Sequence, residues 1–142
     1  MKKATLIMAT LLGLSVTSAQ ADVVNAQTLM DKYTASAQLV NSEFKPSAIE
    51  GKLFFNRTFK NDGHEAACAS CHTQNPANYG KHVVTKKEIK PLSPMVNPKR
   101  FTDIAKVEEK FTEHCNDILG TDCSAQEKAN FIKYLFSETK PH

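Results

Sequence analysis

Apolar residues recur every three or four positions in four separate segments of the chain. This spacing predicts amphipathic helices over residues 23–40, 45–59, 102–114 and 124–138. The apolar positions are Leu29, Met30, Tyr33 and Ala37 in the first segment, Ile49, Leu53 and Phe54 in the second, Ile104, Val107 and Phe111 in the third, and Phe131, Ile132, Leu135 and Phe136 in the last.

Polar and turn-forming residues mark where the helices begin and where they are interrupted. Ser124 with Glu127 follows the capping-box pattern, and Ser47 with Glu50 repeats it before the second helix. Residues 73–100 hold several prolines and little periodicity, which predicts a long ordered loop. We find no convincing strand pattern, so we expect an all-α fold of three or four helices. A loop this long is unusual in a compact domain unless it wraps around something.

The first residues follow the pattern of a secretory signal peptide. Two lysines precede an apolar run over residues 4–16, and the small residues of Ala19–Ala21 form a cleavage site. A retained membrane anchor is the alternative, but a spanning helix needs about 20 apolar residues, and polar residues interrupt this run early. We therefore predict a signal peptide over residues 1–21, cleavage near Ala21, and one exported, periplasmic domain over residues 22–142.

Charge and composition narrow the possible partners. The whole chain has 18 basic and 15 acidic side chains, and the expected signal peptide removes two lysines, which leaves a nearly neutral domain. Near neutrality argues against a nucleic-acid partner. The share of large apolar residues is modest and there is no Trp, so a core this small would gain from a large apolar cofactor.

The stretch ACASCHTQNP places Cys68, Cys71 and His72 in the pattern C-x-x-C-H. A zinc site needs a second pair of ligands at matching spacing, which Cys115 and Cys123 do not supply. A thioredoxin-like dithiol belongs beside a strand in a βαβ unit, and the helical pattern predicts no such unit. A covalent haem c explains all three residues, because both sulfurs form thioethers and His72 becomes the proximal iron ligand. Export agrees with this interpretation, since such haem is attached outside the cytoplasm.

With this motif the chain resembles the class I cytochromes c. In that group a helix with the pattern G-x-x-F/L-F precedes the motif, and a C-terminal helix crosses it. The resemblance implies a class I cytochrome c-like fold in which the long loop wraps one covalent haem. The matching residues are Gly51, Leu53, Phe54 and Phe55 before the motif, and Phe131, Tyr134 and Leu135 on the last helix.

A more specific resemblance covers residues 86–128. This segment is similar to the sphaeroides haem protein family, long described as a domain of unknown function. The family's marks are K-E-I-x-P-L, P-x-R-F-T-D, C-N and G-x-D-C. The matching residues are Lys87–Ile89, Pro91, Leu92, Pro98, Arg100–Asp103, Cys115, Asn116, Gly120, Asp122 and Cys123.

The resemblance implies a distal ligand and a disulfide. Position in the chain alone leaves Met95, His82 and His114 open as the sixth ligand, and Met95 comes first because an ordinary class I cytochrome uses a Met before its last helix. The family instead implies the side-chain amide of Asn116, with Met95 the runner-up, followed by His114 or an open position. It also implies that Cys115 and Cys123 are joined, as export would permit. We expect residues 115–123 to form a short loop.

These features together predict a monohaem electron-transfer protein with a labile distal ligand. A neutral amide is a weak ligand, so its release on reduction would open a position for O₂ or NO. The alternative is a haem enzyme or sensor that acts on O₂, NO or peroxide. We favour electron transfer over catalysis, because His114 is the one candidate for distal acid–base chemistry.

The central loop is basic and points to the kind of partner. It could steer an acidic redox protein to the haem edge, or it could pair with haem propionates. The family resemblance implies a dihaem cytochrome c as the partner, and a membrane cytochrome b is a second possibility. The basic positions are Lys81, His82, Lys86, Lys87, Lys90, Lys99 and Arg100.

Overall fold

The computed structural model describes residues 18–142, with side chains from Val23 onward. The predicted signal peptide therefore lies almost wholly outside the described residues. Within the part of the chain that is described, no helix is both long enough and apolar enough to cross a membrane.

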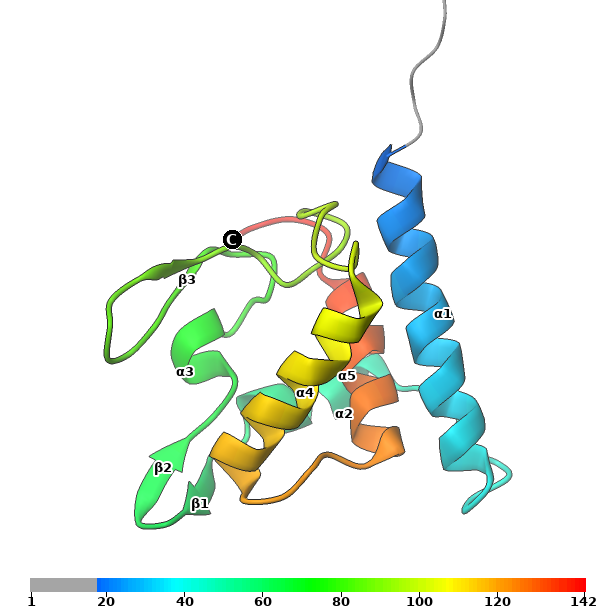
Figure 1. Ribbon diagram of the computed structural model, residues 1–142, viewed down its shortest axis with the longest axis horizontal. Coiled ribbons are helices and arrows are strands. Elements are labelled where there is room, and N and C mark those ends of the chain that lie inside the picture. The colour runs from blue at the N-terminus through cyan, green and yellow to red at the C-terminus, as the bar shows by residue number, and fades with distance from the viewer. Residues whose placement is uncertain (1–17) are drawn as a thin grey trace, which may run out of the picture.

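The chain forms five helices and two small hairpins (Figure 1). The all-α architecture is confirmed, and the four predicted long helices are all present. The prediction of three or four helices missed one short helix of a single turn. The hairpins were also not predicted, because strands of two or three residues are too short to show alternation. The helices are α1 (Ser18–Gln38), α2 (Ala48–Asn56), α3 (Ala69–His72), α4 (Ile104–Leu119) and α5 (Ala125–Ser137). The strands are β1 (Phe59–Asn61), β2 (His64–Ala66), β3 (Gly80–Lys81) and β4 (Glu88–Ile89), paired antiparallel as β1–β2 and β3–β4.

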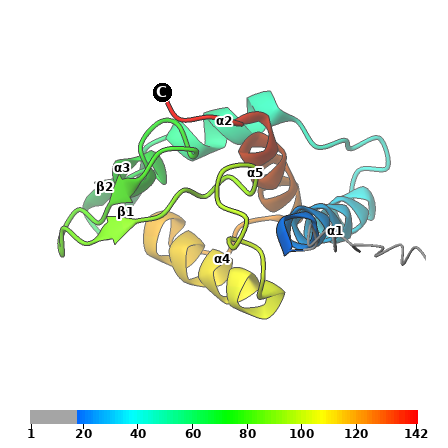
Figure 2. The same cartoon turned by 90° about the horizontal axis from the view of Figure 1, so that it is seen from above.

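Helix α5 is the centre of the fold, with α1 along one side and α2 across it (Figures 1 and 2). Its start has the predicted capping box, in which Ser124 and Glu127 bond each other's backbone N–H. The predicted apolar stripe is confirmed, since Ile132 and Leu135 are buried against α1. This helix therefore fixes the frame on which the motif and α4 are placed.

The crossing of α2 and α5 depends on one glycine. A Cβ at Gly51 would overlap the backbone carbonyl oxygen of Asn130 and lie 2.8 Å from Cβ of Tyr134. The close approach buries Phe54 and Phe55, whereas Ile49 and Leu53 are 73% and 61% exposed. The predicted apolar face of this helix was therefore correct for Phe54 and wrong for Ile49 and Leu53, because the glycine rather than the aliphatic side chains turns toward α5.

Helix α4 continues past the position at which the sequence pattern ends it. It begins at the N-cap Asp103, whose side chain accepts from the N–H of Lys106, and it ends before Gly120 in the left-handed conformation. Residues 115–119 are therefore helical, and the expected loop over 115–123 was wrong in its first half. The polar surface of this last turn had hidden the helical pattern.

The stretch 73–100 is ordered, as predicted, although it contains the unpredicted β3–β4 hairpin. Hydrogen bonds within the stretch and to the end of α5 hold it. The carbonyl oxygen of Pro76 accepts from the N–H groups of Leu92 and Ser93 at 2.8 and 3.1 Å. The hydroxyl of Ser93, which is fully buried, donates to the carbonyl oxygen of Glu138 at 2.7 Å. The loop thus packs on the end of α5 and returns the chain to α4.

Candidate haem site

The C-x-x-C-H motif forms the single turn of α3 and the residue before it. The N–H groups of Cys71 and His72 both donate to the carbonyl oxygen of Cys68. The side chain of Ser70 stabilises the start of the turn, because its hydroxyl accepts from the N–H of Ala67 at 3.0 Å. A single helical turn puts residues three apart on one side, so both sulfurs project from the same edge of α3.

The two motif thiols do not have the character of a redox dithiol. Both cysteines are half-buried and are not bridged to one another. The pKa of the Cys68 thiol is raised to about 11, chiefly by burial, with a smaller contribution from the neighbouring Cys71. Redox-active C-x-x-C pairs have a lowered thiol pKa instead. The environment therefore agrees with the sequence argument against dithiol chemistry.

His72 lies between the aromatic ring of Phe55 and the imidazole of His114. The centroid of its ring is 6.5 Å from that of Phe55 on α2 and 6.3 Å from that of His114 on α4. Metal–imidazole nitrogen bonds are about 2 Å long. Two such bonds, plus the distance from each nitrogen to the centre of its ring, account for the 6.3 Å between the centroids of His72 and His114. The pair has the spacing expected when one metal ion lies between two imidazoles.

Both imidazoles are held in the neutral form, which is the form that binds a metal. The pKa of His72 is lowered to about 4, chiefly by burial and to a smaller extent by the nearby His114 and Arg100. The pKa of His114 is also lowered, chiefly by burial, although Glu113 opposes the change. Two neutral imidazoles that face each other beside two half-buried thiols fit a covalent haem with two protein ligands.

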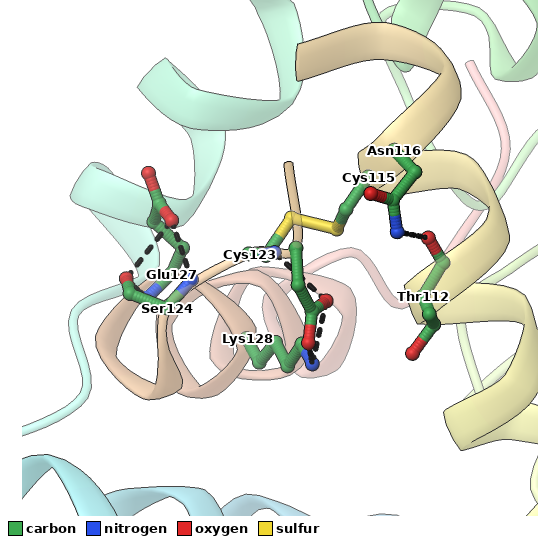
Figure 3. Close-up of a disulfide and its surroundings, with 8 residues drawn as sticks. Thr112, Cys115, Asn116, Cys123, Ser124, Glu127 and Lys128 are labelled. Atoms are coloured by element: carbon green, nitrogen blue, oxygen red, sulfur yellow. Dashed lines mark hydrogen bonds and ion pairs between the residues drawn. A yellow bond between two sulfur atoms is a disulfide. The ribbon is translucent and has the colours of Figure 1, made fainter. Parts of the chain in front are cut away.

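Asn116, the distal ligand that the resemblance implied, is placed differently. Each residue turns an α-helix by about 100°, so Asn116 points to nearly the opposite side of α4 from His114. Its amide Nδ2 donates to the backbone carbonyl oxygen of Thr112 at 2.7 Å, and the side chain is exposed (Figure 3). The geometry therefore favours His114, which the sequence left open as a candidate. Met95 lies in a turn and is 48% exposed.

The predicted disulfide between Cys115 and Cys123 is present. It joins the last turns of α4 to the start of α5, with Cα atoms 5.5 Å apart (Figure 3). Both cysteines are buried in a small cluster with Phe54. Beside the bridge, Lys128 forms an ion pair with Asp122 at 3.0 Å. The residue directly after His114 is thus tied to the body of the protein.

A second tie to the same helix was not predicted. Asn61, at the end of β1, donates from Nδ2 to the carbonyl oxygens of Asn116 and Asp117, both at 3.1 Å. Oδ1 of Asn61 also lies close to Gly120, because a Cβ added at Gly120 would be only 2.8 Å from this oxygen. Sequence signals for this contact are weak, because the two partners are more than 50 residues apart.

Arg100 is the member of the basic loop that faces the site. Its guanidinium donates to the carbonyl oxygens of Lys90 and Pro91, and burial lowers its pKa. It is close enough to lower the pKa of both His72 and His114. The lysines of the loop remain exposed. The predicted basic patch therefore consists of exposed residues and one partly buried residue, Arg100.

Comparison with known proteins identifies the family. A family model described as a domain of unknown function, DUF1924, matches residues 41–135. Cytochrome c'' of Methylophilus methylotrophus is 65% identical over 125 residues, which cover 87% of each chain. The chain is a c-type cytochrome of the sphaeroides haem protein family.

Solved structures agree with this membership. The crystal structure of oxidised cytochrome c'' from Methylophilus methylotrophus matches with a TM-score of 0.80 and 64% identity, covering 85% of this chain and all of that one. A structure of oxidised SHP, described as an oxygen-binding cytochrome c, matches with a TM-score of 0.70 and 32% identity, covering 79% of this chain and 96% of that one. The Cereibacter sphaeroides cytochrome c-type protein SHP is 39% identical over 72 residues, about half of each chain. The family assignment makes this chain a monohaem c-type cytochrome.

Proposed function

We propose that this chain is an exported electron-transfer cytochrome whose haem is joined to Cys68 and Cys71, with His72 and His114 as its axial ligands in the oxidised state. When bound, a c-type haem supplies one-electron chemistry and two axial positions. The single observation that carries the proposal is the pair of neutral imidazoles, from α3 and α4, with ring centroids 6.3 Å apart.

The two axial ligands are not equally well held. His72 belongs to the same helical turn as both sulfurs, so it is positioned by covalent neighbours. His114 belongs to a helix that reaches the site only through its packing and through the bridge at Cys115. We infer that His114 is the ligand that leaves on reduction, while the bridge at Cys115 and the Asn61 contact keep its helix in place.

A relative supports ligand release without proving it for this chain. The solution structure of cytochrome c'' from Methylophilus methylotrophus, 64% identical to this chain, is described as giving insights into haem-ligand detachment. Departure of His114 would expose an axial position to small neutral molecules, and SHP is described as an oxygen-binding cytochrome. Binding of O₂ or NO by the reduced protein is therefore the second part of the proposal.

Replacement of His114 and of Asn116, one at a time, tests the ligand assignment. We expect oxidised His114→Ala protein to change from a low-spin to a high-spin optical spectrum, and added imidazole to restore the low-spin form. Asn116→Ala should keep the low-spin spectrum, because its amide bonds within its own helix. The wild-type protein should become largely high-spin on reduction and bind CO rapidly.

The same pair of variants distinguishes the competing ligands. A low-spin spectrum that survives in His114→Ala and is lost in Asn116→Ala would restore the amide ligand that the family resemblance implied. A spectrum lost only in Met95→Leu would make the protein an ordinary His/Met cytochrome. A reduced wild-type protein that stays low-spin and excludes CO would remove the ligand-release part of the proposal.

A further inference from the structure

The β3–β4 hairpin forms an exposed projection with two apolar residues at its tip. Residues 81–88 are all exposed, and Val83 and Val84 are 50% and 77% exposed. Figure 1 shows the hairpin reaching outward beside α3, on the side away from α1, and Figure 2 agrees. The two exposed valines adjoin each other at the tip and belong to neither hydrophobic core cluster of the described residues. We refer to residues 80–90 as the basic hairpin.

The basic hairpin also concentrates the charge of the chain. It contains four lysines and one acidic residue, Glu88. Its excess of three positive charges equals the formal net charge of the entire chain, +3. Two of the chain's positive charges belong to the predicted signal peptide, so the mature domain carries +1 and its residues outside the hairpin sum to −2. The hairpin is therefore a positive end on an otherwise slightly acidic domain. Such an asymmetric charge steers an oppositely charged partner into a preferred orientation.

Hydrogen bonds make the tip of the hairpin rigid. Nδ1 of His82 accepts from the N–H groups of Val84 and Thr85 at 3.2 and 3.1 Å. The backbone of His82 also exchanges bonds with Lys86 and Lys87, both at 2.9 Å. A preformed surface loses little conformational entropy on binding, which favours association through a small contact area.

The base of the hairpin rests directly on the haem-binding turn. A Cβ at Gly80 would overlap the carbonyl oxygen of Cys71 and lie 3.0 Å from Cα of His72. The glycine therefore lets β3 lie against α3 with no side chain between them. A partner seated on the hairpin would be close to the point of haem attachment, which electron transfer requires.

We propose that the basic hairpin is the docking surface for an acidic redox protein, with Val83 and Val84 at the centre of the contact and lysines around them. The proposal rests on the electron-transfer function above and adds the place and chemistry of the partner. Transient redox complexes bury a small area, below about 1,200 Å², which suits a single rigid hairpin. One electron is exchanged per encounter, so that one protein is oxidised and the other is reduced.

Reduced plant-type ferredoxin is a suitable probe, because it is a small acidic one-electron donor. Its cluster gives up one electron and the oxidised cytochrome takes it, which stopped-flow absorbance follows directly. We expect the second-order rate constant to fall with rising salt. Lys87→Glu with Lys90→Glu should lower it about tenfold at low ionic strength. Val83→Ser with Val84→Ser should lower it at high salt as well.

A matched control has the same change of charge elsewhere. Lys45→Glu with Lys133→Glu reverses two exposed lysines outside the hairpin and should lower the rate far less. In a titration followed by NMR, amide shifts should gather on residues 81–87. The hairpin variants should keep the wild-type optical spectra, whereas His114→Ala should change the spectrum and leave the salt dependence in place, so the two proposals can fail separately.

Three results would overturn the docking surface. Equal loss of rate in the hairpin and control variants would mean that net charge alone matters. NMR shifts centred on the exposed Ile49 and Leu53 of α2 would place the contact on another face. Unchanged ferredoxin kinetics, with hairpin-dependent flotation on phosphatidylglycerol vesicles, would make the hairpin a contact for anionic membrane instead.

Discussion

The two imidazoles that face each other, His72 and His114, are held by different kinds of structure. The proximal side is local: one helical turn contains both thiols and the imidazole, and its hydrogen bonds stay within residues 67–72. The distal side is assembled from distant segments, because α4 is fixed by the bridge to Cys123 and by Asn61 of the β1–β2 hairpin.

This difference supports the proposal that His72 is a permanent ligand and that His114 is exchangeable. A ligand adjacent to two covalent attachments cannot leave without strain in the same turn. A ligand on a packed helix can turn its side chain away while its backbone stays in place. The comparison is the structural basis for the proposal that α3 anchors the haem and that α4 carries the exchangeable ligand.

The strongest test of the anchoring side removes both thioethers. Cys68→Ala with Cys71→Ala should abolish covalent haem, which would reduce the mass of the purified protein by one haem. Acid–acetone extraction should leave colour on the wild-type protein and remove any haem from the variant. Replacement of both Cys115 and Cys123 by serine is the control, and it should keep the haem attached. Covalent haem in the alanine variant would contradict the assignment of α3.

The crossing of α2 and α5, which supports both sides of the site, should lose stability when Gly51 is replaced. Gly51→Ala introduces a methyl group against the backbone of Asn130, where rigid atoms cannot move aside. Overpacking of this kind costs up to about 3 kcal/mol, and we expect that much loss in the free energy of unfolding from urea titration. Lys52→Ala, an exposed neighbour on the same helix, should change stability little. Similar stability for the two variants would refute the close crossing.

The disulfide tests the regulated side. Cys115→Ser with Cys123→Ser should reduce stability by roughly 2–3 kcal/mol, because a closed loop of this length restricts the unfolded chain by that amount. It should also increase the high-spin fraction of the oxidised protein, since α4 would hold His114 less firmly. Urea titration gives the first quantity and the optical spectrum the second. An unchanged spin state would show that packing alone positions the helix.

The smallest expected effect concerns Tyr134, which supports the chain just after the motif. Its hydroxyl donates to the carbonyl oxygen of Gln74 at 2.8 Å, and burial, followed by Glu138, raises its pKa from 10.0 to about 12. Tyr134→Phe should cost about 1 kcal/mol near neutral pH.

The pH dependence of the same residue has a definite sign. Below pH 10 the tyrosine is protonated in both states, so its contribution is complete. Between pH 10 and about 12 the unfolded chain loses the proton while the folded protein keeps it, so stability falls as pH rises. Urea titrations across this range should show a shallower decline in Tyr134→Phe. Identical slopes in the two proteins would mean that other groups control alkaline unfolding.

The sequence by itself determined the parts of this protein that depend on neighbouring residues. The C-x-x-C-H turn, the capping box at Ser124 and the apolar stripe of α5 can each be recognised within a few residues, because helical geometry relates positions three or four apart. The family resemblance added the disulfide, which the structure contains. Local patterns thus gave the fold class and the cofactor.

Only the tertiary structure decided which residue faces His72. The sequence and the resemblance together offered Asn116, Met95, His82 and His114. Nothing local separates them, because a distal ligand is brought to the site by packing of distant segments. The extension of α4 through Leu119 placed residues 114 and 116 on nearly opposite sides of one helix. Helix rotation, set by burial of Cys115 and by the contact with Asn61, is a property of the assembled core. It directs His114 toward His72 and leaves Asn116 to bond within its own helix.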